Sequence, residues 1–400
     1  MSISGMFAPF FGGGAEFSSF NLAKWLLKQG HEVGVLTTAP TPQDVMDGEL
    51  YEGLRMWRVY MPRPYSIHQR GKAWQKPIWH LQDHFDPANR KIAARVFDTF
   101  KPDFINIHIL QGVGLNIIEE VAARNIPALY WQHDLGLVCL KRSMFANGQN
   151  CSQQCALCKV SCRYQQNLVS KMGRITICSP SQANLDRIGR YFPLSSFHTR
   201  ATLNANVYPM PTVSRTDSGG VLRLLYVGRL DVTKGIDLLL DACEALADKH
   251  RFSLTIVGGG PDEEKLRARA KPFSWCHFTG LVPQSEVSNY MAQSDLLVIP
   301  SIWPENSPGV VIHALTMGLP VLGSDKGGIP ELVEHDKNGL LVPPGDAPKW
   351  KNALQHILET PNDLAKWRTY ATDNAHKFSQ ESLAQKIYAI ITETMERPLP

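Results

Sequence analysis

The sequence has 400 residues, of which 44% are hydrophobic and 20% are charged, and its formal net charge is +4. This length predicts two domains of about 200 residues each, because a single hydrophobic core seldom serves more than roughly 300 residues. The small positive charge gives no indication of nucleic-acid binding, and the lack of an 18-residue apolar run excludes a conventional membrane-spanning helix. The start, MSISGMFAPF, lacks the features of a secretory signal, so the cytosol is the expected location.

Short apolar strands alternate with helices along the first half of the chain. The opening residues 1–7 are interrupted by Ser and Gly, and indicate either a short first strand or the end of one that begins upstream. An amphipathic helix is expected at 17–30 and a strand directly after it, with further strands at 102–109, 126–133 and 173–180. This alternation predicts a parallel sheet covered by helices on both faces.

Three glycines in the segment PFFGGGAEF (9–17) come immediately before the first expected helix. Glycine lets the backbone approach a ligand, and free N–H groups at a helix start attract an anion such as a diphosphate. An ordinary glycine turn explains the pattern equally well. The segment is not G-x-G-x-x-G, and no acidic residue ends the next strand to bind a ribose.

Residues 53–80 contain six Lys or Arg, three Trp and no Asp or Glu. Basic and aromatic residues together suit an anionic membrane surface. They also suit an anionic glycan, or a solvated loop whose aromatic side chains are buried. The sequence leaves these three interpretations open.

Four of the eight cysteines, Cys151, Cys155, Cys158 and Cys162, follow one another at the spacing of one helix face. A regular helix would separate the outer pair by about 16 Å, too far for one ion, so a shared structural zinc needs a folded loop. A metal could also use two of these cysteines with Cys139. Buried free thiols and a disulfide or redox pair are the other interpretations.

The second half repeats the alternation after a linker at 208–220, which is rich in Pro, Ser and Gly. We therefore expect an N-terminal domain at 1–207 and a C-terminal domain at 208–378. A last helix, within 379–400, is expected to cross back onto the first domain.

Two cations, Arg229 and Lys234, lie in the loop YVGRLDVTKG (226–235) after a strand that ends at Gly228. Ligands of open α/β sheets bind beyond the carboxyl ends of the strands. Two cations placed there can neutralise a diphosphate and stabilise it as a leaving group. Solvated surface charges are the plainer alternative.

The stretch IWPENSPGVVIHALTMG (302–318) contains a second candidate site. Ser307 is expected to cap a helix whose first residue is Pro308. The amides of Gly309 and Val310 would then point outward with the positive end of the helix dipole, ready for phosphate. Glu305, just before them, has no evident structural role beyond capping a neighbouring loop.

Together these motifs resemble the family 4 retaining glycosyltransferases of the GT-B fold. The resemblance is strong over 221–345, through segments such as GRLDVTKG, IVGGGPDEEKL, PSIWPENSPGVVIHALTMGLPVLGSDKGGIPELV and NGLLVPPGD. It is weaker in the first half, at PFFGGGAEF, LKQGHEVGVLT and the QHD after a strand. The resemblance implies two doubly wound parallel-sheet domains, Rossmann-like, which face each other across a cleft.

The resemblance also implies roles for single residues. Arg229 and Lys234 would hold the donor's diphosphate, Glu305 would contact hydroxyls of the transferred sugar, and His133 would lie near its C6 hydroxyl. Backbone groups would complete the donor site, at Gly13, Gly14, Leu281, Val282, Pro308, Gly309 and Val310. The family's second Glu, which usually binds the ribose hydroxyls, is replaced here by His313. The His313→Glu variant is then expected to keep activity or to bind nucleotide more tightly.

The activity implied by the resemblance is transfer of a hexose from a nucleoside-diphosphate sugar to a hydroxyl of a glycan or lipid-linked acceptor. Configuration is retained, and neither a protein nucleophile nor a catalytic metal or other cofactor is required. Polysaccharide, lipopolysaccharide or glycolipid assembly, in the cytoplasm or peripherally on the membrane, would be the context. The alternatives are a catalytically weakened partner protein, suggested by His313, or a nucleotide-sugar epimerase; a phosphorylase would be longer and would carry a pyridoxal lysine.

Overall fold

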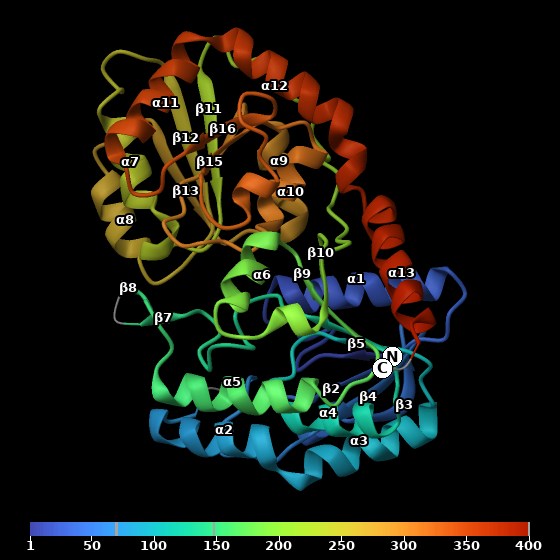
Figure 1. Cartoon of the computed structure of the whole chain (residues 1–400). Coiled ribbons are helices and arrows are strands. Elements are labelled where there is room, and N and C mark those ends of the chain that lie inside the picture. Colours follow the sequence, from blue (N-terminus) through green and yellow to red (C-terminus); the bar gives the residue numbers. More distant parts are fainter. Residues whose placement is uncertain (69–70, 147–148, 399–400) are drawn as a thin grey trace. The chain divides into compact units, whose positions relative to one another are not determined.

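The computed structural model describes residues 1–68, 71–146 and 149–398 (Figure 1). The chain divides into two compact units. The first consists of Met1–Asn206 with Leu383–Pro400, and the second of Val207–Ser382. Each unit has its own sheet with helices on both faces, so each is doubly wound.

The first unit is built on an eight-stranded sheet of order β10-β9-β6-β5-β1-β2-β4-β3. The strands are β1 (Ser2–Ile3), β2 (Gly34–Thr38), β3 (Met46–Tyr51), β4 (Leu54–Val59), β5 (Ile105–Ile107), β6 (Ala128–Trp131), β9 (Ile175–Ser179) and β10 (His198–Ala201). All neighbours are parallel except the β3–β4 hairpin. A separate pair, β7 (Phe145–Ala146) and β8 (Gln149–Asn150), is antiparallel.

The helices of this unit are α1 (Gly14–Lys28), α2 (Lys76–Phe85), α3 (Pro87–Phe100), α4 (Ile118–Ala123), α5 (Ala156–Val169), α6 (Gln182–Gly189) and α13 (Gln380–Glu396). Its central strands are buried along their whole length, which explains an apolar run such as Ala128–Trp131 of β6. Strand β1 pairs with β2 on one side and β5 on the other. Only glycine fits at Gly5, shortly after this strand, because a Cβ there would lie 1.9 Å from the carbonyl oxygen of Gln111.

Helix α13 returns from the end of the chain and packs on the first unit, beside α1 (Figure 1). The ring of Tyr388 lies 5.9 Å from that of Trp25 on α1. The hydroxyls of Thr394 and Thr176, the latter on β9, are hydrogen-bonded at 2.7 Å. The predicted crossing of the last helix to the first domain is therefore confirmed.

The second unit contains a six-stranded, fully parallel sheet of order β13-β12-β11-β14-β15-β16. The strands are β11 (Leu222–Val227), β12 (Phe252–Val257), β13 (Cys276–Gly280), β14 (Leu296–Ile299), β15 (Val321–Ser324) and β16 (Gly339–Val342). The helices are α7 (Ile236–Glu244), α8 (Glu263–Ala270), α9 (Gln284–Ala292), α10 (Gly309–Thr316), α11 (Ala347–Glu359) and α12 (Pro361–Asn374). The two fully buried tryptophans Trp350 and Trp367 anchor α11 and α12 to the core of this unit.

Within the described part of the chain, no helix combines the length and apolar composition needed to cross a bilayer.

Candidate functional site

The carboxyl ends of β11 and β14 form the centre of the candidate site in the second unit. These strands are parallel neighbours, so the loops that follow them start side by side. The loop after β11 carries Lys234 at the end of a short 3-10 helix, Val232–Lys234, and the loop after β14 carries Glu305. The Nζ of Lys234 lies 2.6 Å from Oε1 of Glu305, which also accepts a hydrogen bond from Ser301 at 2.8 Å. The structure thus brings together two residues that lie 71 positions apart in the sequence.

Glycines hold the backbone around this pair. Gly327 has φ +63°, and a Cβ there would lie 2.2 Å from the carbonyl oxygen of Glu305. That same oxygen accepts a hydrogen bond of 2.8 Å from the N–H of Gly328. Gly235, with φ +69°, lets the loop after β11 pass within contact of the Pro300 carbonyl. Any side chain at these two positions would push the loops apart.

Arg229 lies on the same loop as Lys234, but its guanidinium is exposed and lies near Asp231, with Nε 3.4 Å from Oδ2. Asp231 caps the short 3-10 helix by accepting hydrogen bonds from the N–H and hydroxyl of Thr233. The carbonyl of Arg229 accepts a bond of 2.9 Å from the hydroxyl of Tyr226. The backbone of Arg229 is therefore fixed while its side chain remains accessible to a ligand.

Helix α10 begins at Gly309, and its N-cap is Pro308. The prediction of Ser307 as the cap is wrong by one residue, because Pro308 is extended and no side chain caps the helix. The N–H groups of the first turn, at Gly309 and Val310, have no partner inside the helix. The hydroxyl of Ser307 is buried without a hydrogen-bond partner among the described residues. A helix start with unpaired donors is a natural anion site.

His313, on the same helix, is only 3% exposed. Its Nε2 lies 3.1 Å from the hydroxyl of Ser288 and 3.3 Å from the carbonyl of Pro209, and its ring stacks on Tyr208. Ser288 already donates its proton to Pro209 at 2.6 Å, so Nε2 of His313 faces two acceptors and carries a proton itself. Burial lowers the pKa of this imidazole, so it is neutral.

Leu281 and Val282 follow β13 on the same edge of the sheet. Leu281 is exposed, and its Cγ would lie 3.1 Å from a Cβ added at Gly259, which follows β12. These residues therefore border the loops after β12 and β13.

In the first unit, the glycine loop leads into α1, whose N-cap is Gly13 and whose first residue is Gly14. Apart from its chain neighbours and the backbone of its own helix, no atom of the described residues lies within 4 Å of a Cβ placed on Gly14, so its backbone is open to a ligand. Glu16 in the first turn is buried, and this burial raises its pKa.

His133 follows β6, and His108 follows the neighbouring strand β5. Nδ1 of His108 lies 3.0 Å from Nε2 of His133, and both rings stack with Trp131. Burial lowers the pKa of His133 to about 3, so the pair is neutral at pH 7. His108 was not among the residues predicted from the sequence, although a His directly after each of two neighbouring strands is a readable signal.

A buried polar network continues from this pair into a cavity of about 50 Å³. It includes Asp83, which is buried with Arg63 and accepts a bond of 2.8 Å from the N–H of Gly112. It also includes Arg142, which pairs with Asp134 and donates to Gln111 at 3.0 Å. Desolvation raises the pKa of Asp83 to about 7. These residues gave no signal in the sequence because each lies in a different segment.

The cysteine segment does not form the predicted zinc site. Helix α5 begins after Cys155, so Cys151 and Cys155 lie before the helix, whereas Cys158 and Cys162 are buried within the core. Across residues 1–68, 71–146 and 149–398, no three His, Cys, Asp or Glu side chains gather as metal ligands. All four cysteines are free thiols, and the buried pair serves as small apolar core residues.

The structure divides the basic and aromatic segment 53–80. Trp57 and Arg58 are buried on or beside β4, and Arg63 and Trp79 are also internal. Trp74 is exposed, as are Lys72 and Lys76, whereas Arg70 lies outside the described residues.

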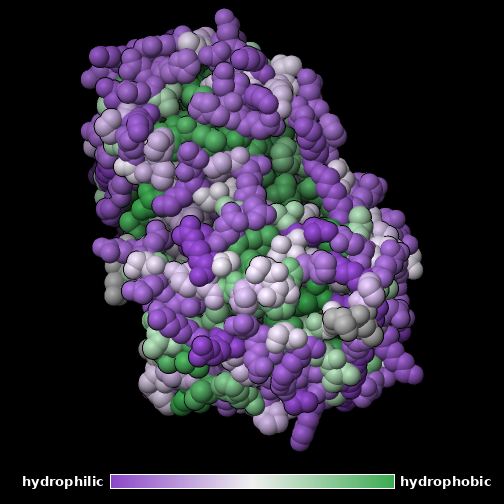
Figure 2. All heavy atoms as spheres, in the orientation of Figure 1, coloured by the Kyte–Doolittle hydropathy of each residue, from purple (hydrophilic) through white to green (hydrophobic). Residues whose placement is uncertain are grey.

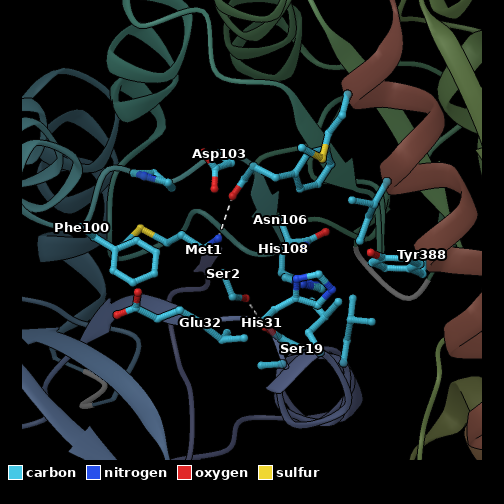
Figure 3. A pocket seen from close by; sticks show the side chains of 18 of the residues that line it. Met1, Ser2, Ser19, His31, Glu32, Phe100, Asp103, Asn106, His108 and Tyr388 are labelled. Carbon is cyan, nitrogen blue, oxygen red and sulfur yellow. Dashed lines mark hydrogen bonds between the residues drawn. The ribbon is translucent and has the colours of Figure 1, made fainter. Parts of the chain in front are cut away.

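A larger cavity of about 300 Å³ lies in the first unit between α1, α13 and the amino ends of β2 and β5 (Figure 3). The side chains of Ser2, Asn106 and His108 line one part of it, and Tyr388 of α13 lines another. None of the residues predicted from the sequence to bind a ligand lines this cavity.

Residues 217–374 match the family described as "Glycosyl transferases group 1". A relative named amylovoran biosynthesis glycosyltransferase AmsK, from Erwinia amylovora, is 36% identical over 146 residues. The match spans about a third of either protein, namely 34% of this chain and 35% of AmsK.

Solved structures resemble the whole chain. Sucrose-phosphate synthase from Thermosynechococcus elongatus has a TM-score of 0.73 at 20% identity and covers 98% of both chains. HepE from Anabaena, in complex with UDP, has a TM-score of 0.68 at 18% identity, covering 98% of this chain and 100% of its own. At such identities the likeness shows the fold, which is GT-B. The match to the group 1 glycosyl transferases covers residues 217–374, less than half of the chain.

Proposed function

We propose that the chain is a retaining glycosyltransferase. It moves a hexose from a nucleoside-diphosphate sugar to a hydroxyl of a glycan or lipid-linked acceptor. The name of AmsK refers to amylovoran biosynthesis, which supports a role in polysaccharide assembly. HepE was solved in complex with UDP, which supports a nucleotide-sugar donor. We extend the same proposal to lipopolysaccharide and glycolipid assembly, at the cytoplasmic face of a membrane.

The observation that carries the proposal is the Lys234–Glu305 contact of 2.6 Å at the carboxyl edge of the second sheet. A sugar diphosphate contains both an anion and a row of hydroxyls, and this pair offers a cation and an acceptor for them. Lys234 and Glu305 are 25% and 14% exposed, so both remain reachable while partly shielded from water. Charge stabilisation is stronger in such a setting than in bulk water.

Further groups in each unit, taken by itself, are suited to other parts of a donor. Arg229 supplies a second, accessible cation, and the free amides of α10 supply donors to phosphate oxygens. In the first unit, neutral His133 and the open backbone at Gly13 and Gly14 are suited to hydrogen bonds with the sugar and diphosphate. We assign the nucleoside base to the edge formed by Leu281 and Val282.

The proposed reaction uses the leaving diphosphate as its own base. The acceptor hydroxyl attacks the anomeric carbon from the face the diphosphate leaves, and a diphosphate oxygen takes the hydroxyl proton. Lys234 and Arg229 stabilise the charge that builds on the diphosphate, and Glu305 holds the sugar in place. No enzyme nucleophile is needed.

The experiment begins with thermal unfolding in the presence of UDP, GDP, ADP and dTDP and their common hexose conjugates. A ligand that binds the folded state raises the melting temperature by mass action. The donor selected in this way is then incubated with candidate acceptors, and the anomeric configuration of the product is read by proton NMR. Inversion of configuration would refute the retaining mechanism.

Lys234→Met should abolish the shift caused by the diphosphate, whereas the matched control Lys271→Met, an exposed lysine elsewhere in the second unit, should keep it. Donor binding without transfer to any acceptor, but with interconversion of sugar epimers, would favour the epimerase alternative. Absence of nucleotide binding would favour a partner protein without turnover.

A further inference from the structure

Helix α2 and the 3-10 helix before it (Ala73–Gln75) expose a stripe of large apolar side chains. The stripe consists of Trp74, Ile78, Leu81 and Phe85, which are between 43% and 64% exposed. Their spacing of four, three and four residues places them on one side of the helix. The opposite side is buried through Trp79, Asp83 and His84. Figure 2 shows apolar atoms on the surface over α2.

Helix α5 lies directly beside α2 and continues this stripe. The hydroxyl of Ser161 lies 3.0 Å from Nε2 of His84, and the ring of Tyr164 lies 4.7 Å from that of Phe85. Leu157 and Val160 precede Tyr164 on the same side of α5, at the i, i+3, i+7 spacing of one face. Both are almost 70% exposed. We call these six exposed residues, four from the first stripe and two from α5, the α2–α5 face.

An isolated exposed apolar residue needs no explanation, but a continuous patch on two packed helices does. Packing within the first unit does not explain the apolar character of this patch, since each of the six side chains is exposed and faces away from the core of the unit.

The charge around the α2–α5 face indicates what covers it. Residues 53–82, which include most of α2, and residues 135–185, which include α5, contain twelve Lys or Arg and no Asp or Glu. Of these cations, Lys72, Lys76, Lys159 and Arg163 are exposed on the two helices or just before them. Asp83, the one carboxylate within α2, is buried against Arg63. Asp86, at the end of α2, is 31% exposed and lies near Arg63. An apolar stripe bordered by four exposed cations and one partly exposed carboxylate complements the headgroups and acyl boundary of an anionic bilayer.

We propose that the α2–α5 face docks the first unit onto an anionic lipid surface, with the apolar stripe entering the headgroup region and the lysines contacting the phosphates. The face lies on the 3-10 helix Ala73–Gln75, α2 and α5. It includes no residue of the segment 53–70, where Trp57, Arg58 and Arg63 are internal. The inference goes beyond the transfer reaction and does not depend on it, since no donor or acceptor is needed for docking.

The test uses the full chain and vesicles of phosphatidylcholine, with and without about one third phosphatidylglycerol. We expect at least tenfold stronger co-sedimentation with the anionic vesicles at low salt, falling as salt screens the attraction. The double variants Leu81→Ser/Phe85→Ser and Leu157→Ser/Val160→Ser should each weaken binding at least tenfold. Leu50→Ser, which removes an equally exposed leucine on β3, should leave it unchanged.

A second measurement locates the contact. Trp74 is the only exposed tryptophan among the described residues. Brominated lipids should therefore quench its fluorescence, and Trp74→Phe should remove that quenching. Circular dichroism and melting temperature show whether each variant is folded. The proposal is overturned if the folded double variants bind like the wild type, or if binding is absent. It is equally overturned if the same variants convert a dimer into a monomer without any vesicle binding, because the face is then an interface between two copies.

Discussion

Replacing His313 by glutamate tests whether this side chain serves the ligand or the protein's own structure. The family resemblance predicts that glutamate is tolerated, since it would restore the usual carboxylate. The contacts in the structure predict the opposite. Nε2 of His313 donates toward Ser288 and the carbonyl of Pro209, and a carboxylate can only accept.

The magnitude follows from these contacts. In the His313→Glu variant at pH 7.5, the one hydroxyl proton of Ser288 can reach either the Pro209 carbonyl or the new carboxylate, but not both. The other acceptor then has no hydrogen bond, at a position where the native side chain is only 3% exposed. A stranded buried polar group costs about 1–3 kcal/mol, and more when charged, so we expect a loss of about 3 kcal/mol. For a unit of this size, this lowers the melting temperature by about 6–12 °C.

His313→Gln is the matched control, because its amide places an N–H donor where Nε2 stood. We expect it to melt within about 2 °C of the wild type. The gap between the two variants should narrow at pH 5, because burial raises the pKa of the new glutamate and its protonated form can donate. Differential scanning calorimetry at both pH values gives the answer. Equal melting temperatures for the two variants at pH 7.5, with nucleotide affinity kept or improved, would refute the structural reading and restore the ligand role.

Three further outcomes are expected. Glu305→Gln should lower kcat, measured as nucleoside diphosphate release, by about 10²–10³-fold. It should change the melting temperature little, because its partner Lys234 is partly exposed. Turnover within threefold of the wild type would contradict the site. Gly327→Ala should lower the free energy of unfolding, measured in urea, by at least about 2 kcal/mol. Gly345→Ala should lower it less, because Gly345 has a similar φ of +74° but no described atom lies within 4 Å of a Cβ placed there. The free energy of unfolding of the wild type should fall by about 2 kcal/mol between pH 7.5 and 5 through His133 alone. In the unfolded chain the imidazole, with a pKa near 6.5, binds a proton at pH 5, whereas in the folded protein, with a pKa of about 3, it does not. The His133→Gln variant should lose this part of the pH dependence.

Much of the second unit's site could be predicted from the sequence. Arg229, Lys234 and Glu305 lie in loops that follow apolar strands, and the strand–loop–helix order already places such loops on one edge of a parallel sheet. The start of α10 was located to within one residue, because proline and glycine restrict where a helix can begin.

The environment of each side chain could not be predicted in the same way. His313 was expected to face a ligand, yet its nitrogen contacts Ser288 and Pro209, 25 and 104 residues away. The sequence left a shared zinc, buried free thiols and a disulfide or redox pair open for the four cysteines, and only the packing shows that α5 begins after Cys155 and that Cys158 lies in the core.

The sequence by itself indicated the central strands, the helices that alternate with them in the second unit, and the loops that carry the cations and the carboxylate, because those depend on hydrophobic periodicity and on the local geometry of glycine and proline. Only the tertiary structure decided that His108 meets His133, that Arg63 is buried with Asp83, and that α2 and α5 share one exposed apolar face. Pairings of this kind depend on packing between segments distant along the chain, and burial is a property of the neighbours that surround a residue rather than of the residue itself.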